Sequence, residues 1–257
     1  MKISGLELPA DLRRKFLLEG YVALPGFLRP NDVEVLLDNV RQFIQAVVPN
    51  MPREHVFYED RERPETLKQL QAMHLYHDYF AGLFAGSQFE QLASKLLGDE
   101  VVGQNLQFFN KPPGVGQPTP AHQDGYYFML APCEAVTMLL ALDVVDEENG
   151  CVRYVQSSHQ KGMRPHGRTQ VLGFSQGIID YPRAEDLAKE VSMPAKPGDL
   201  LVHHALTIHR ADANRSTNRS RRALGFIYYA QRAKEDIAAK QAYQARLADE
   251  MKTAGKI

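Results

Sequence analysis

The chain has 257 residues, of which 44% are hydrophobic and 24% charged, a composition typical of a globular protein with a sizeable core. Its 30 basic and 31 acidic residues give a formal net charge of -1, which favours neither nucleic acid nor an anionic membrane as a partner. The two cysteines, Cys133 and Cys151, are too few for a disulfide framework. We expect both to be small core hydrophobes in a reducing, cytoplasmic setting. The chain shows neither an apolar leader core nor a stretch long enough to span a membrane.

The first hundred residues are predicted to be mostly helical. Helix ends are indicated by Gly20 and Gly98, and a strand end by Pro25. The segment 50–66 is polar and broken by prolines, so we interpret it as a loop that could cover a pocket. In chain order we predict a helix over 9–20, a strand over 21–25, a helix over 31–48, the loop over 50–66, and helices over 67–84 and 89–97.

After residue 100 the hydrophobic period becomes that of short strands separated by turns rich in Pro, Gly and Asn. The predicted strands are 101–110, 126–130, 135–142, 152–155, 200–204 and 223–230, followed by a surface helix over 234–251. Several short strands at this spacing favour a sandwich or jelly-roll barrel. We therefore predict one domain over 1–257, mainly β with flanking helices. It has a helical N-terminal part (about 1–99), a barrel (about 100–231) and a C-terminal helix (about 232–253).

The triplet His122-Gln123-Asp124 carries the strongest chemical signal. Side chains alternate along a strand, so His122 and Asp124 would point to one face and Gln123 to the other. A His and a carboxylate joined by one distant His form the ligand set of a non-haem Fe(II) site, which leaves positions open for a co-substrate and dioxygen. A third ligand must come from elsewhere, and the histidines at 203, 204 and 209 all compete for that place.

Four segments in fixed order resemble the phytanoyl-CoA dioxygenase family of Fe(II)/2-oxoglutarate oxygenases. They are Phe109–Asp124, Glu148–His159, the Pro197–His204 strand entry, and His209 followed by Asn214-Arg-Ser and Arg221-Arg222-Ala223. The resemblance covers about 17–229. It implies a double-stranded β-helix (a cupin-like jelly roll) as the core. It also implies Fe(II) as the metal, with 2-oxoglutarate and dioxygen as co-substrates.

The resemblance also assigns site residues. The metal ligands would be His122, Asp124 and His209, with no further catalytic residue beyond them. His203 and His204 would then be packed core residues or would support the ligands. The carboxylate of 2-oxoglutarate that lies far from the metal requires a cation, and the family position selects Arg221, with Arg222 as the alternative.

Two polar residues on neighbouring predicted strands are further candidates for contact with 2-oxoglutarate. These are Gln107 and Thr137, although polar residues at strand edges are equally common without such a role. Lys111, beside two prolines, is expected in a surface turn. His159 is expected to be structural.

The implied activity is oxidation, typically hydroxylation, of a small organic substrate with conversion of 2-oxoglutarate to succinate and CO2. Halogenating relatives lack the carboxylate ligand, so Asp124 favours hydroxylation. The alternative is a cupin-like metal-binding protein or isomerase that does not turn over 2-oxoglutarate. A loop over 161–177 with Arg164, His166 and Arg168 is compatible with an anionic substrate or with a solvated surface. Neither the substrate nor the oligomeric state follows from the sequence.

Overall fold

The computed structural model describes residues 9–171, 174–243 and 245. The helices are α1 (Leu12–Glu19), α2 (Pro30–Ala46), α3 (Asp78–Phe84), α4 (Gln88–Leu97), α5 (Gly125–Phe128) and α6 (Ala184–Lys189). Short 3-10 turns are η1 (Val48–Asn50), η2 (Arg53–His55), η3 (Pro64–Thr66), η4 (Met73–Leu75) and η5 (Ser158–Lys161). The strands are β1 (Tyr21–Leu24), β2 (Val56–Tyr58), β3 (Leu67–Leu70), β4 (Val101–Lys111), β5 (Thr119–His122), β6 (Leu130–Ala131), β7 (Ala135–Ala141), β8 (Val152–Val155), β9 (His166–Val171), β10 (Phe174–Ile178), β11 (Glu190–Met193), β12 (Leu200–His204), β13 (His209–Ala211), β14 (Arg221–Ala230) and β15 (Lys234–Glu235).

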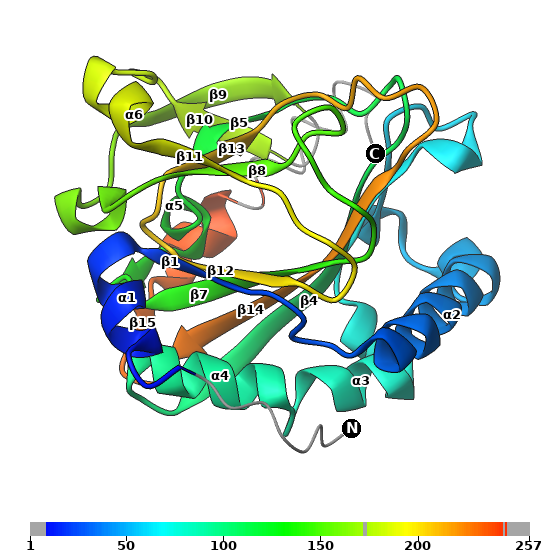
Figure 1. Cartoon of the computed structure of the whole chain (residues 1–257), viewed down its shortest axis with the longest axis horizontal. Coiled ribbons are helices and arrows are strands. Elements are labelled where there is room, and N and C mark those ends of the chain that lie inside the picture. The colour runs from blue at the N-terminus through cyan, green and yellow to red at the C-terminus, as the bar shows by residue number, and fades with distance from the viewer. Residues whose placement is uncertain (1–8, 172–173, 244, 246–257) are drawn as a thin grey trace.

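Two antiparallel sheets face each other in the described part of the chain (Figure 1). The larger has seven strands in the order β1-β12-β7-β14-β4-β3-β2, and the smaller has four in the order β11-β8-β13-β5. Strand neighbours are far apart in sequence, since β14 lies between β7 and β4. This arrangement agrees with the prediction of a mainly β jelly roll with flanking helices.

Helices cover the outer face of the large sheet, where α3 and α4 lie against it (Figure 1). In α4 the Ser87 side chain accepts hydrogen bonds from the first helical N–H groups, and Gly98 ends the helix with φ 66. Its apolar stripe packs on β14, where the Phe89 ring stacks on Phe226 with centroids 4.0 Å apart. The main core therefore lies between the helices and the sheet, and leaves the inner face for the site.

Register fixes which residues share that inner face. Alternation places Leu224 and Phe226 in the helix-covered core, so the residues between and beside them on β14 face the small sheet. On β4, Lys111 lies opposite Arg221 and Gln107 opposite Gly225. On the other side Ile227 pairs with Thr137 of β7, which in turn pairs with His203 of β12. These pairs form the wall of the barrel interior.

Two predicted elements in the N-terminal half are wrong. The segment 67–84 was expected to be one helix, but Leu67–Leu70 forms β3, and α3 begins only at Asp78. The expected loop over 50–66 contains β2, which pairs with β3. Pairing of Gln69 and Leu70 with β4 extends the large sheet, and this tertiary pairing outweighs the local helical pattern. β2 and β3 are therefore part of the large sheet that forms one wall of the barrel.

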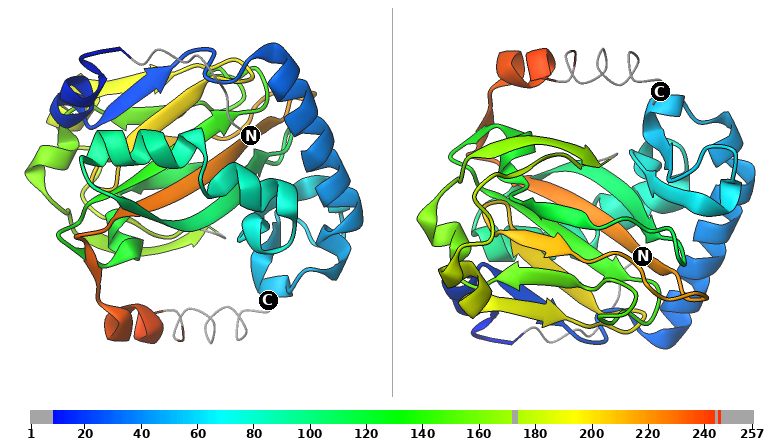
Figure 2. Two further views of the ribbon diagram at one scale, coloured as in Figure 1. Left: turned by 90° about the horizontal axis from the view of Figure 1, so that it is seen from below. Right: turned by 90° about the horizontal axis from the view of Figure 1, so that it is seen from above.

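The predicted C-terminal helix begins later than expected. Lys234–Glu235 form β15 and pair with β6, and residues 237–243 are helical. Figure 2 shows this helix at the edge of the molecule away from α2. Residues 244 and 246–257, where the predicted helix continues, lie outside the described part. The boundaries of the single domain remain a prediction.

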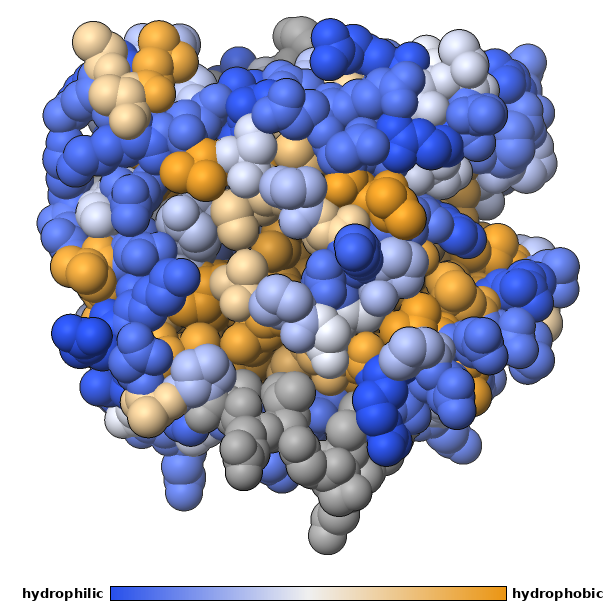
Figure 3. Space-filling view, in the orientation of Figure 1, coloured by the Kyte–Doolittle hydropathy of each residue, from blue (hydrophilic) through white to orange (hydrophobic). Residues whose placement is uncertain are grey.

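The face seen in Figure 1 is mostly hydrophilic above, with hydrophobic residues gathered in its middle and beside α2 (Figure 3). Large apolar side chains that are exposed include Leu18 of α1 and Val35 of α2. Among the described residues, no helix has both the length and the apolar character needed to cross a bilayer. The expected cytoplasmic location stays a prediction.

Candidate metal centre and co-substrate site

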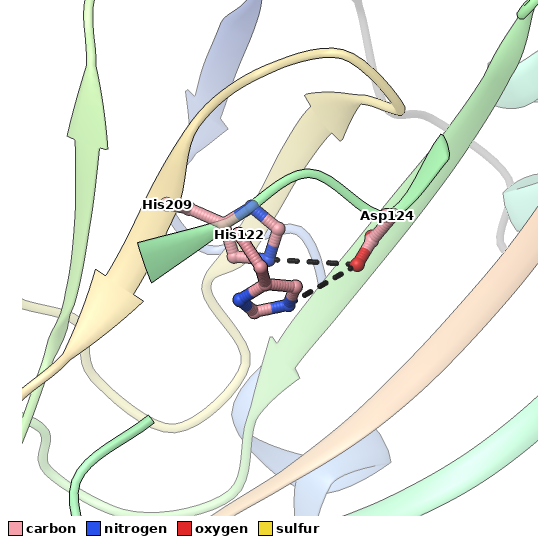
Figure 4. A group of neighbouring side chains, drawn as sticks. All are labelled: His122, Asp124 and His209. Atoms are coloured by element: carbon pink, nitrogen blue, oxygen red, sulfur yellow. Dashed lines mark ion pairs between the residues drawn. The ribbon is translucent and has the colours of Figure 1, made fainter. Parts of the chain in front are cut away.

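Three potential metal ligands converge between the two sheets. His122 ends β5 and lies opposite His209, the first residue of the neighbouring strand β13. The Nε2 atoms of His122 and His209 lie 3.4 Å and 3.6 Å from Asp124 Oδ1 (Figure 4). Ligand atoms about 2.1 Å from one metal ion, at right angles, are about 3 Å apart. The triangle therefore has nearly the size that a single ion requires, and both imidazoles are buried.

Asp124 reaches this position by a different route from the one predicted. β5 ends at His122, and Asp124 has helical dihedrals (φ -57, ψ -33) as the residue that precedes α5. The strand expected over 126–130 is wrong, because Gly125–Phe128 forms this short helix. The Gly125 N–H donates to Ala205 O, and a Cβ here would lie 2.4 Å from Cys133 Sγ. A glycine is therefore needed where the turn passes close to its neighbours.

Gln123 anchors the triplet through its side chain, although the strand alternation expected across the triplet ends at His122. Its side-chain NH2 donates to Gly162 O and Leu206 O at 2.9 Å and 2.7 Å, and its Oε1 accepts the Arg164 N–H. The side chain is fully buried. All of these bonds join Gln123 to surrounding loops, so they fix the backbone between the two ligand-bearing residues.

The hydrogen bonds of both imidazoles at Nδ1 turn Nε2 toward the carboxylate of Asp124. His122 Nδ1 lies 2.8 Å from Pro120 O, and His209 Nδ1 lies 3.0 Å from Thr207 O. Because a carbonyl oxygen only accepts, each Nδ1 must carry the proton. The neutral ring then directs the Nε2 lone pair at the carboxylate, which is the tautomer that binds a metal.

The charges of the site residues also suit metal coordination. Burial by itself would raise the pKa of Asp124, but interactions with His209, His122 and His203 outweigh it and hold this pKa well below its ordinary value. Burial, followed by repulsion from His122 and His203, lowers the pKa of His209 well below 6.5. At neutral pH the site therefore holds an anionic carboxylate beside a neutral imidazole.

Neither of the other two histidines that competed for the third position joins the triangle. His203 Nε2 is 3.0 Å from Asp124 Oδ2, the oxygen that does not face the two ligand imidazoles, and its ring centroid lies 4.2 Å from that of His209. The Thr137 hydroxyl donates to the same oxygen at 2.6 Å. His204, the next residue, accepts the Leu206 N–H at Nδ1 and packs near Phe16. Of the three candidates, the structure brings only His209 into the triangle with His122.

Arg221 and Arg222 have opposite environments. Arg221 is buried on the inner face, where its Nε donates to Gly150 O at 3.1 Å. Burial lowers its pKa, and no carboxylate in the described part of the chain pairs with it. Arg222 points away from the interior and forms an ion pair with Asp143, with Nη2 2.6 Å from Oδ1. Of these two arginines, Arg221 is therefore the one that lies inside the barrel without a carboxylate partner among the described residues.

Lys111 was expected in a surface turn, and this prediction is wrong. It is buried opposite Arg221 in the β4–β14 register, and its Nζ donates to Gln117 O. Burial, followed by repulsion from Arg221 and Lys68, lowers its pKa well below 10.5. Strand alternation from Gln107 could have placed Lys111 on the inner face, since the two residues are four apart. The interior therefore contains a second basic side chain beside Arg221.

Gln107 lies on the same face and accepts a hydrogen bond from Gln69 Nε2 at 2.7 Å. The Oε1 of Gln69 is buried and has no partner in the described residues. This pair lines the barrel wall at β3 and β4. Contact of Gln107 and Thr137 with 2-oxoglutarate stays a prediction, although Thr137 already donates to Asp124.

The loop expected to be solvated or to face the substrate is largely sequestered. Arg164 is buried and pairs with Asp180 and Asp186, at 2.7 Å in each case. His166 Nδ1 donates to Arg164 O, its Nε2 accepts the Gln123 N–H, and its ring stacks on Tyr126. His166 is therefore half-buried with both nitrogens bonded to the backbone, and its contact with a substrate stays a prediction. Arg168 lies in β9.

Three residues expected to be structural agree with the structure. His159 lies in η5, with Nε2 3.0 Å from Leu17 O. Cys151 is buried and Cys133 half-buried, and neither forms a disulfide. Burial raises the pKa of the Cys133 thiol to about 11, so this thiol is protonated at neutral pH.

Comparison with known families decides between the remaining readings. The family model described as phytanoyl-CoA dioxygenase (PhyH) matches residues 16–223. The chain belongs to this family. Across 217 residues it is 25% identical to a protein of Stutzerimonas stutzeri named as a probable alpha-ketoglutarate-dependent hypophosphite dioxygenase, covering 82% of this chain and 76% of that protein. It is 29% identical over 127 residues to the peroxisomal phytanoyl-CoA dioxygenase of Bos taurus, covering 46% of this chain but only 37% of that enzyme.

Solved structures confirm the predicted double-stranded β-helix. The epimerase SnoN, solved in complex with Fe3+, alpha ketoglutarate and nogalamycin RO, superposes with a TM-score of 0.68 at 24% identity, over 90% of this chain and 88% of that one. Family membership also confirms the prediction of iron and 2-oxoglutarate as the cofactors of this class of oxygenase. The described donor set of two imidazoles and one carboxylate fits such an iron.

Proposed function

We propose that this member of the phytanoyl-CoA dioxygenase family hydroxylates a small organic substrate, with conversion of 2-oxoglutarate to succinate and CO2. The observation that carries the proposal is the buried Arg221 on the inner face of the large sheet, which faces the small sheet that carries His122 and His209. Arg221 has no carboxylate partner among the described residues. A buried cation without a partner is costly, and an anionic ligand would supply the missing charge. Metal binding alone would not require a buried arginine at this position.

In the proposed site, His122, Asp124 and His209 hold the iron. When bound, iron and 2-oxoglutarate supply the oxidative chemistry, and the protein supplies position and charge. The Arg221 Nε is held by Gly150 O, so its two terminal nitrogens can form a bidentate contact with the distal carboxylate of 2-oxoglutarate. Lys111 lies beside it as a second basic side chain, and an anion bound there would favour its protonated form. Gln107, on the same strand as Lys111, is a proposed polar contact for the co-substrate.

Hydroxylation is favoured over halogenation because Asp124 occupies the position that a halide would need. The structure supports this choice, since the carboxylate is held by two donors on its outer oxygen and faces both imidazoles with the other. The alternative, a metal-binding protein or isomerase without 2-oxoglutarate turnover, gives no role to the buried Arg221.

The substrate is proposed to be a small molecule. Arg164 and His166 were the basis for an anionic substrate, but each is engaged within the protein. Hypophosphite, named for the Stutzerimonas stutzeri relative, is one candidate that a screen should include. Release of succinate above the substrate-free level would identify an accepted class.

An anaerobic titration tests the proposal directly. The apoprotein receives Fe(II) and then 2-oxoglutarate, and a weak visible charge-transfer band is expected only after the keto acid is added. Exposure to air should then produce succinate even without substrate. Absence of both the band and the succinate would exclude the oxygenase function and leave the metal-binding alternative.

A further inference from the structure

The two oxygens of Asp124 have different partners. Oδ1 faces the Nε2 atoms of the two ligand imidazoles. Oδ2 accepts the Thr137 hydroxyl at 2.6 Å and lies 3.0 Å from His203 Nε2. A carboxylate that has donors on one oxygen cannot rotate to present both oxygens to a metal without breaking those bonds. The environment of Oδ2 therefore decides how the carboxylate is presented.

A second hydrogen bond orients His203. Its Nδ1 lies 2.9 Å from the Tyr154 hydroxyl. The carboxylate oxygen can only accept, so His203 Nε2 carries a proton, and in the neutral ring Nδ1 accepts from Tyr154. Both side chains are almost completely buried. This gives a directed chain in which Tyr154 donates to His203 and His203 donates to Asp124.

The chain links the two sheets at one point. His203 of β12 pairs in register with Thr137 of β7, so both donors to Oδ2 come from the large sheet. Tyr154 comes from β8 of the small sheet, directly opposite His209 of β13. The Tyr154 ring is held by Tyr21 of β1, stacked with centroids 4.8 Å apart. The packing of both sheets therefore sets the position of the imidazole.

We propose that His203 is a positioning residue for the metal centre, and that Tyr154 acts through it. Together with Thr137, His203 holds Oδ2 so that Asp124 offers the single oxygen Oδ1 to the metal. Three protein donors then leave the remaining positions of a six-coordinate ion for the keto acid and dioxygen. The inference rests on the proposed function, because it assumes that the triangle binds a metal.

Cobalt(II) is a suitable probe, since it binds the same type of site and its visible spectrum reports coordination. His203→Phe keeps a flat ring but removes both nitrogens, and Tyr154→Phe removes only the hydroxyl. We expect His203→Phe to raise the Co(II) dissociation constant by about tenfold or more and to change the Co(II) spectrum. Tyr154→Phe should have a smaller effect in the same direction. The neighbouring His204→Asn is the matched control and should leave both quantities unchanged.

The double variant separates positioning from general damage to the structure. If Tyr154 acts through His203, adding Tyr154→Phe to His203→Phe should cause no further loss of Co(II) affinity. If the losses of Co(II) affinity in the two single variants instead add up in the double variant, Tyr154 does not act through His203. Wild-type Co(II) affinity and spectrum in His203→Phe would contradict the positioning role itself. Should His203→Phe fail to fold, Tyr154→Phe alone still tests the inference, because wild-type Co(II) affinity and spectrum there would contradict it. Absence of Co(II) binding by the wild-type protein would instead contradict the proposed function.

Discussion

Replacement of Arg221 by methionine separates the requirement for 2-oxoglutarate from stability. Methionine keeps an apolar stem of similar length but removes the charge and the bond from Nε to Gly150 O. Removal of one member of a buried charge pair costs about 3–5 kcal/mol. Lys111 remains as a second buried basic side chain beside the site, so the lower end of this range applies. It corresponds to about a 100-fold increase in the KM for 2-oxoglutarate.

The thermal stability of the Arg221→Met protein should not follow the change in its KM for 2-oxoglutarate. In the protein without 2-oxoglutarate, Arg221 is buried without a carboxylate partner among the described residues. Replacing such a cation by an apolar side chain is often neutral or stabilising. We therefore expect the Tm of the unliganded Arg221→Met protein to equal or exceed that of the wild type. In contrast, 2-oxoglutarate should no longer raise it.

Arg222→Met is the matched control for this experiment. Arg222 is partly exposed and paired with Asp143, so its loss should cost at most about 1 kcal/mol of stability. The KM for 2-oxoglutarate should stay within about twofold of the wild-type value, because Arg222 points away from the proposed co-substrate site. Succinate release at varied 2-oxoglutarate, without substrate, gives both constants. A larger KM effect in Arg222→Met than in Arg221→Met would refute the reasoning.

Three further outcomes can be measured on the same protein. Divalent metal at 100 times its Kd should stabilise the wild type by about 2.7 kcal/mol, and Asp124→Ala should lose both this stabilisation and metal-dependent turnover. Burial lowers the pKa of His204 to about 4. In the unfolded chain His204 binds a proton near pH 6.5, whereas in the folded chain it stays neutral down to about pH 4. The free energy of unfolding of the wild type therefore falls as the pH decreases from 6.5 to 4. In urea titrations His204→Asn should remove up to about 3 kcal/mol of that loss, and an identical pH dependence in both proteins would contradict the assignment. Arg164→Ala should lower the free energy of unfolding by about 3 kcal/mol through its buried pair with Asp186, with an unchanged KM for 2-oxoglutarate.

Strands flanked by turn residues were predictable from the sequence, whereas elements set by distant pairing were not. β7 and β12 match their predicted ranges closely because apolar runs end at Pro/Gly/Asn turns. β3 was predicted as helix, since nothing local indicates its pairing with β4. Tyr126 and its aromatic neighbours favour a strand by propensity, but the backbone already turns into a helix at Asp124. Tertiary contacts decided both cases.

In the candidate site, too, some residues could be predicted from the sequence and others only from the assembled fold. His122, Asp124 and His209 could be selected from spacing and family resemblance. Strand alternation could have placed Lys111 on the inner face with Gln107, but its position opposite Arg221 depends on the register of β4 with β14. The contact of His203 with Asp124 joins residues 79 positions apart and is visible only once the two sheets are assembled.

The position of Asp124 in the turn that opens α5 limits how the protein can change during evolution. The same short helix carries Tyr126, which stacks on His166, and Tyr127, whose hydroxyl donates to Gln176 O of β10. Residues that shape the surroundings of the metal therefore share one helical turn with a metal ligand. Substitutions that reshape this wall for a new substrate would also shift the carboxylate, so specificity and metal affinity cannot be altered independently along this segment.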